Sequence, residues 1–95
     1  MDKKKKLLFV VNPISGTKGK DSILRQISLH LNKSLFNYHI EKTQYQGHAS
    51  ELTQKAVSDG YDIVVAIGGD GTVNEVARSL VHTSTALGII PCGSG

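Results

Sequence analysis

The sequence predicts an α/β fold, a three-layer Rossmann-like parallel sheet with helices on both faces. Three apolar runs have the length of a strand and end at Gly, Pro or Asn. Each run is continuous rather than alternating, which is typical of strands covered on both faces. Segments with helical spacing lie between the strand candidates. Such β-α-β alternation builds parallel sheets through right-handed crossovers.

The expected strands are the apolar runs 7–11, 63–67 and 86–90, together with a more polar segment at 38–43. The polar segment alternates in character, which suits the edge of the sheet. The strands at 7–11 and 63–67 then lie side by side. Their carboxyl ends open at a topological switch point, the place where ligands bind in such sheets.

Three helices are expected between these strands because apolar residues recur there at helical spacing. The apolar positions are Ile23, Leu24, Ile27 and Leu31 in the first helix, Ala49, Leu52, Ala56 and Val57 in the second, and Val73, Val76, Ala77, Leu80 and Val81 in the third.

Length and composition indicate one small globular domain, with 95 residues, 39% hydrophobic and 20% charged. The single cysteine, Cys92, excludes an intrachain disulfide and fits a cytoplasmic protein.

No apolar run approaches the length that spans a bilayer, so any membrane contact is expected to be peripheral. The net charge of +3 comes largely from lysines 3–6. Without a basic stripe interleaved with aromatics, nucleic-acid binding is not expected.

Residues 68–75 (Gly-Gly-Asp-Gly-Thr-Val-Asn-Glu) join a buried strand to an amphipathic helix. Glycines allow positive φ and close backbone approach, and a helix N-terminus attracts phosphate. A bare Asp70 carboxylate would repel phosphates, and Mg²⁺ resolves this by binding both. The alternative is a tight turn followed by a Thr72–Glu75 capping box. Three glycines and a carboxylate exceed what a turn needs, which favours the phosphate interpretation.

The same segment does not match two common nucleotide-binding motifs. It lacks the Gly-Lys-Ser/Thr ending of a Walker loop, and Asn74 stands where a dinucleotide fingerprint has its third glycine.

Two further loops are expected to join the glycine loop at one edge of the sheet. Residues 12–16 (Asn-Pro-Ile-Ser-Gly) leave the first strand, and residues 91–95 (Pro-Cys-Gly-Ser-Gly) leave the last one. An Asn amide can donate and accept hydrogen bonds, and Pro13 fixes the chain's exit. Thr43 and residues 47–49 can line the same rim, with His48 as a helix-start or surface residue rather than a base.

Together these motifs resemble the diacylglycerol kinase catalytic domain, in the bacterial branch of soluble lipid kinases related to sphingosine kinases. The residues that carry the resemblance are Asn12-Pro13-x-Ser15-Gly16, Thr43 with Gly47-His48-Ala49, Gly68 to Glu75, and Pro91-x-Gly93-Ser94-Gly95. NAD kinases and 6-phosphofructokinases share the core of the glycine-aspartate motif. The Asn-Pro loop and the last loop favour a lipid kinase.

The resemblance implies that residues 1–95 are the N-terminal nucleotide-binding part of a lipid/NAD-kinase-like fold, whose C-terminal lipid-binding domain is absent from this chain. It implies ATP and Mg²⁺ as cofactors, with Asp70 serving catalysis and holding the metal. It assigns to the nucleotide Asn12, Ser15, Gly16, Thr43, Gly68, Gly69, Asp70, Gly71, Thr72, Asn74 and Ser94. Ser94 stands where many relatives carry Thr, and the hydroxyl persists.

The expected activity is transfer of the ATP γ-phosphate to a lipid hydroxyl, such as that of diacylglycerol, in the full-length protein. The fragment alone is expected to be inactive. An NAD kinase or phosphofructokinase relative, or a non-catalytic nucleotide-binding module, remain as alternatives. Expected partners are ATP, a lipid substrate and the inner face of the membrane at its periphery. The fragment is also expected to expose an apolar patch or to form a homo-oligomer, because a missing domain uncovers surface.

Overall fold

The computed structural model describes residues 4–13 and 19–91. In chain order these residues form β1 (Lys5–Val11), α1 (Gly19–His30), β2 (Phe36–Lys42), α2 (His48–Ser58), β3 (Ile63–Gly68), α3 (Asp70–Leu80) and β4 (Ala86–Pro91). The predicted alternation of strands and helices is therefore confirmed. None of the described helices has the length and apolar character needed to cross a membrane.

The strands form one parallel sheet in the order β2-β1-β3-β4. The polar strand β2 lies at one edge, and β1 and β3 are neighbours, as predicted. Leu7 pairs with Tyr38 on one side and with Ile63 on the other. This central position explains why the side chains from Leu7 to Val11 are all buried.

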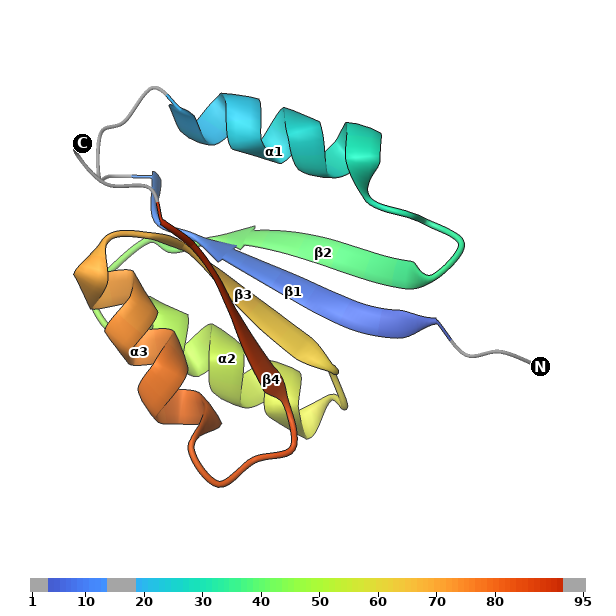
Figure 1. Ribbon diagram of the computed structural model, residues 1–95. Helices are drawn as coiled ribbons and strands as arrows, with labels where there is room; N and C mark the ends of the chain where they lie inside the picture. The colour runs from blue at the N-terminus through green and yellow to red at the C-terminus, as the bar shows by residue number, and fades with distance from the viewer. Residues whose placement is uncertain (1–3, 14–18, 92–95) are drawn as a thin grey trace.

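Successive side chains of each strand point to opposite faces of the sheet, and each face has its own apolar layer. Helix α1 covers the face of Phe9, Val11 and Ile67, on which its apolar positions pack. Helices α2 and α3 cover the face of Val10 and Ala66. Figure 1 shows α1 on one side of the sheet and α2 with α3 on the other. The predicted three-layer arrangement is confirmed.

Two strands begin earlier than the apolar pattern indicates. β1 starts at Lys5, and β2 runs from Phe36 to Lys42 rather than over 38–43. The reason is backbone pairing: Lys5 pairs with Phe36, and the Lys5 N–H donates to the Leu35 carbonyl at 2.9 Å. The ladder therefore continues past the last buried side chain, a feature that hydrophobic periodicity does not report.

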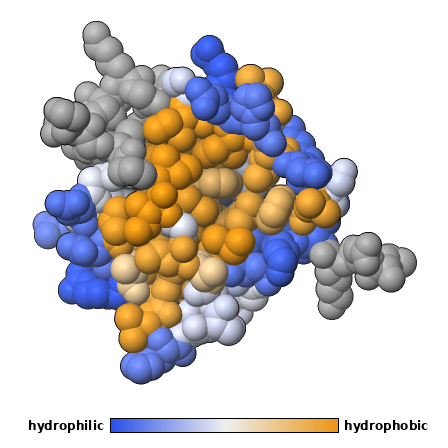
Figure 2. Space-filling model, viewed as in Figure 1, coloured by the Kyte–Doolittle hydropathy of each residue, from blue (hydrophilic) through white to orange (hydrophobic). Residues whose placement is uncertain are grey.

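The edge strand β4 leaves large apolar side chains uncovered. Leu87 is 40% exposed and Ile89 is 49% exposed, and Val81, just after α3, is 58% exposed. Leu87 and Ile89 pair with Val64 and Ala66, so they lie on the face of α2 and α3 but at its open margin. Figure 2 shows a wide hydrophobic area in the view in which β4 lies in front. The expected apolar patch is present.

Candidate functional site

The carboxyl ends of the strands converge at one edge of the sheet. The Asn12 N–H donates to the Ile67 carbonyl at 3.1 Å, and the Thr43 N–H donates to the Val11 carbonyl at 2.8 Å. Gly68 pairs with Pro91, the last residue of β4. The loops after β1 and β3 therefore leave the same edge, as predicted. Residues 92–95 of the last loop lie outside the described residues.

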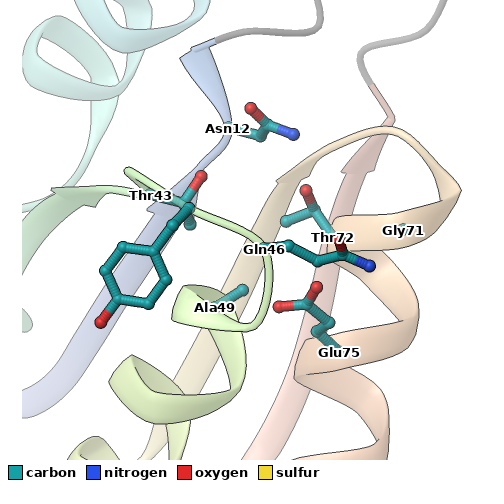
Figure 3. Close-up of a pocket in the computed structure, with 8 residues that line it drawn as sticks. Asn12, Thr43, Gln46, Ala49, Gly71, Thr72 and Glu75 are labelled. Carbon is teal, nitrogen blue, oxygen red and sulfur yellow. The ribbon is translucent and has the colours of Figure 1, made fainter.

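A cavity of about 310 Å³ opens at this edge, between the end of β1, the β2–α2 turn and the first turns of α3 (Figure 3). It is lined by Asn12, Thr43, Tyr45, Gln46, Ala49, Gly71, Thr72 and Glu75. Its volume is at the lower end of the range of small-molecule sites, and its lining mixes apolar surface with amide, hydroxyl and carboxylate groups.

The structure brings four of the predicted site residues together in this cavity: Asn12, Thr43, Gly71 and Thr72. The other predicted residues of the glycine segment, Gly68, Gly69, Asp70 and Asn74, belong to the same strand–helix junction but do not line the cavity. Asp70 and Asn74 are exposed on α3. The predicted residues Ser15, Gly16 and Ser94 lie outside the described part of the chain.

The structure does not require a glycine at all three glycine positions of the junction. Among the described glycines only Gly47 and Gly60 have positive φ, so the expectation that the junction uses glycine for positive φ is wrong. A Cβ on Gly68 would lie 3.0 Å from Thr72 Oγ1, so packing requires that glycine. A Cβ on Gly69 or Gly71 would meet nothing within 4 Å. Neither fold nor packing requires those two, and both leave open space at the helix start.

The alternative interpretation of this segment, a Thr72–Glu75 capping box, does not hold in the structure. Helix α3 begins at Asp70 with Gly69 as its N-cap and no side-chain cap hydrogen bond. Thr72 is thus the third residue of the helix, and it is buried against the junction. The box fails because the helix starts before Thr72, which leaves no N-cap role for its hydroxyl.

Glu75 bonds to a different helix instead. Its Oε2 accepts a hydrogen bond from the Gly47 N–H at 3.2 Å, and its carbonyl accepts one from Ser50 Oγ at 3.4 Å. Gly47, with a φ of 92°, is the N-cap of α2. Because it is a glycine, it has no side chain that could cap the helix. Glu75 therefore satisfies an N–H group at the start of α2 and joins α2 to α3 at the cavity wall.

The β2–α2 turn is ordered by an aromatic pair. The rings of Tyr45 and His48 stack at a centroid distance of 4.3 Å and an interplanar angle of 15°. His48 Nδ1 accepts from the Gln44 N–H at 2.9 Å, and the Tyr45 hydroxyl donates to Glu51 Oε1 at 2.6 Å. This hydrogen bond to Glu51 raises the pKa of Tyr45. His48 is the first residue of α2, as predicted for a helix-start histidine.

Sequence reasoning missed Tyr45, Gln46 and Glu75 as members of the cavity wall. A signal for Glu75 is present, because it lies three and four residues after Thr72 and Gly71, on the same face of the helix. No comparable periodic signal marks Tyr45 or Gln46, since both belong to a turn whose path depends on tertiary contacts.

The residues at the helix start fit a magnesium ion held jointly with phosphate. Asp70 offers an exposed carboxylate between two glycines with open space around them. Over residues 4–13 and 19–91, no group of three or more His, Cys, Asp or Glu side chains can enclose a metal. Mg²⁺ is usually held by one or two carboxylates together with substrate phosphates and water, which this arrangement permits.

Comparisons with known proteins converge on one family. The model of the diacylglycerol kinase catalytic domain matches residues 6–95. The chain is 31% identical over 93 residues to a diacylglycerol kinase of Staphylococcus saprophyticus subsp. saprophyticus, covering 96% of this chain and 30% of that protein. It is 33% identical over 99 residues to sphingosine kinase 1 of Arabidopsis thaliana, covering 96% of this chain and 20% of that protein.

The fold agrees with this sequence similarity. A crystal structure of a diacylglycerol kinase from Bacillus anthracis str. Sterne superposes with a TM-score of 0.75 at 32% identity, covering 98% of this chain and 35% of that one. The chain therefore spans about a third or less of the length of these relatives.

Proposed function

Because the chain belongs to the diacylglycerol kinase catalytic domain family, we propose that it is the ATP-binding part of a lipid kinase. In the complete enzyme, a phosphotransferase, the γ-phosphate of ATP passes to a lipid hydroxyl such as that of diacylglycerol. The observation that carries the proposal is the open space over Gly69 and Gly71 at the start of α3, next to the cavity. Glycine is costly inside a helix, so Gly71, which serves neither a positive φ nor packing, fits a ligand that approaches the backbone closely.

In this proposal the first turn of α3 holds the phosphates. Its N–H groups have no partner within the helix, and the helix dipole favours negative charge there. Asn12, Thr43 and Thr72 contribute an amide and two hydroxyls from the cavity wall. Ser15, Gly16, Gly68, Asn74 and Ser94 complete the proposed set by the family resemblance.

Asp70 is the proposed metal-binding residue of the site. Its carboxylate keeps Mg²⁺ beside the phosphates, and the bound ion supplies positive charge that offsets the charge developing on the transferred phosphoryl group. The general base and the lipid pocket are proposed to belong to the remainder of the kinase, so residues 1–95 alone are proposed to be inactive. The partners proposed are ATP and a lipid reached by peripheral contact with the inner face of the membrane from the cytoplasm.

Gly71→Ala tests the phosphate site directly. An alanine meets nothing within 4 Å there, so the free energy of unfolding should stay level or rise by up to about 1 kcal/mol. Its methyl group would occupy the proposed phosphate position, so calorimetry should show ATP binding weakened by about tenfold or more. Gln54→Ala, on the exposed surface of α2 away from the cavity, is the control and should leave affinity unchanged. An unchanged affinity in Gly71→Ala contradicts the proposal.

The kind of kinase is tested on the complete polypeptide. Phosphate transfer from ATP is measured with a panel of lipids, NAD and fructose 6-phosphate as acceptors. Transfer to a lipid is expected. Transfer only to NAD or to the sugar phosphate would assign one of the related kinase activities, and ATP binding without any transfer would indicate a non-catalytic module.

A further inference from the structure

An exposed aromatic side chain lies in the wall of the cavity. Tyr45 is 52% exposed although it is large and aromatic, and it lines the cavity from the β2–α2 turn. Its stacking partner His48 does not line the cavity. One side of the ring is therefore covered by the imidazole, and about half of the side chain remains exposed.

The Tyr45 ring is held in place before any ligand arrives. Its hydroxyl donates to Glu51 at 2.6 Å, its ring stacks on His48, and the His48 N–H donates to the Tyr45 carbonyl at 3.1 Å. The imidazole is itself fixed by the Gln44 N–H. An ordered side chain loses little conformational entropy on binding, so a ring restrained in this way is a preorganised contact surface.

The phosphate end and the aromatic end belong to different walls of the cavity. Gly71 and Thr72 come from the first turn of α3, whereas Thr43 and Tyr45 come from the end of β2 and the turn that follows. Figure 3 shows Thr43 and Gly71 on opposite sides of the cavity. A nucleotide with its phosphates at the start of α3 therefore extends its base toward the β2–α2 turn.

We propose that the stacked Tyr45–His48 pair is a platform on which the purine base of the nucleotide stacks, an inference that rests on the proposed ATP-binding function. Aromatic stacking uses the π-face that every base has, and its loss weakens binding by roughly 5- to 150-fold per base. A purine covers more of the ring than a pyrimidine does. The competing explanation is that the pair only stabilises the turn, which affects folding but not the preference for a base.

The first test compares ligands with and without a base on the 95-residue chain. Tyr45→Leu, which keeps apolar bulk but no aromatic ring, should bind ATP about tenfold or more weakly, yet bind inorganic tripolyphosphate as the wild type does. Tyr45→Phe keeps the ring and should bind ATP within about threefold of wild type. UTP should bind the wild type more weakly than ATP does. The Tyr45→Leu substitution should also reduce the affinity for UTP by a smaller factor than the affinity for ATP. Equal loss of ATP and tripolyphosphate would assign Tyr45 to the turn alone.

The second test does not depend on affinity. The chain has no tryptophan, so Tyr45→Trp places a single indole emitter at the platform. ATP should quench its emission by stacking, whereas tripolyphosphate should not. Calorimetric binding of ATP to Tyr45→Trp without quenching overturns the platform and leaves the proposed function standing. Absence of ATP binding to the wild type overturns the proposed function itself.

Discussion

Asp70 is the first residue of α3, and its carboxylate is exposed beside two glycines that leave open space. In the complete form of the proposed kinase we predict that Asp70→Asn lowers turnover by about two orders of magnitude or more, the scale seen when one strong electrostatic contact is lost. Nucleotide binding should weaken far less, because it draws on many backbone donors. Steady-state kinetics and calorimetry measure the two effects.

Asparagine preserves size but not charge, so folding should change by only about 0.3–1 kcal/mol through the helix dipole. Asp70→Glu keeps the charge and serves as the matched variant, with turnover between those of wild type and Asp70→Asn. Near-normal turnover in Asp70→Asn at unchanged thermal stability would show that Asp70 serves only as a helix-start residue and does not hold the metal.

Helices α2 and α3 are joined by Glu75, whose carboxylate accepts from the Gly47 N–H. We predict that Glu75→Ala lowers the free energy of unfolding by about 1–2 kcal/mol, because a partly buried N–H group loses its acceptor. Urea denaturation measures the change. Glu75→Gln retains an amide oxygen and should lose less. Hydrogen exchange at Gly47 gives a local readout, and unchanged exchange of that amide in Glu75→Ala would show that the contact is not maintained in solution.

The β2–α2 turn should respond to alkaline pH through Tyr45. Its hydrogen bond to Glu51 raises the pKa above the ordinary value of 10.0, so the bond stabilises the fold fully below about pH 10 and is lost as pH rises through the raised pKa. The difference in urea midpoint between wild type and Tyr45→Phe should be constant from about pH 7 to 9 and then shrink. Tyr61, whose pKa is raised by burial, titrates in both proteins, so its contribution cancels in the difference between their urea midpoints. A difference independent of pH contradicts the assignment.

The elements were predictable where burial dictates side-chain pattern. The runs at 7–11 and 63–67 are apolar throughout because β1 and β3 are covered on both faces, and the polar pattern of β2 placed it at the edge. Strand ends were less predictable, because ladder hydrogen bonds continue beyond buried side chains.

The candidate site was predictable only in part, for a related reason. Asn12, Thr43, Gly71 and Thr72 follow strands whose ends meet by topology alone. Tyr45 reaches the cavity because a ring stack and a hydrogen bond to Glu51 fold the turn, contacts that have no periodic signature. The partner of the Glu75 carboxylate has the same kind of origin, since it is the N–H group of Gly47, 28 residues away in the sequence.

The molecule as a whole presents an uncovered apolar margin along β4. We predict that the 95-residue chain self-associates, so that its apparent mass rises with concentration in sedimentation experiments. Ile89, 49% exposed on the edge strand, is the residue to change: Ile89→Lys should lower association because a charge on an edge strand opposes pairing. Leu29→Lys is the control, since Leu29 is 71% exposed but belongs to α1 rather than to the edge strand. A monomer at all concentrations, or equal effects of both variants, would contradict this prediction.

The central position of β1 also bears on how the chain is synthesised. β1 is synthesised before both of its partner strands, because Leu7 pairs with Tyr38 and with Ile63. Its apolar segment therefore stays outside the sheet until those later residues have been added. At about 5–20 residues per second this interval is roughly 3–11 s for a nascent chain, long compared with hydrophobic collapse. Lysines 3–6 stand directly before that segment. Charges that flank an exposed apolar strand act as gatekeepers against aggregation, and this run of lysines stands at such a flanking position before β1.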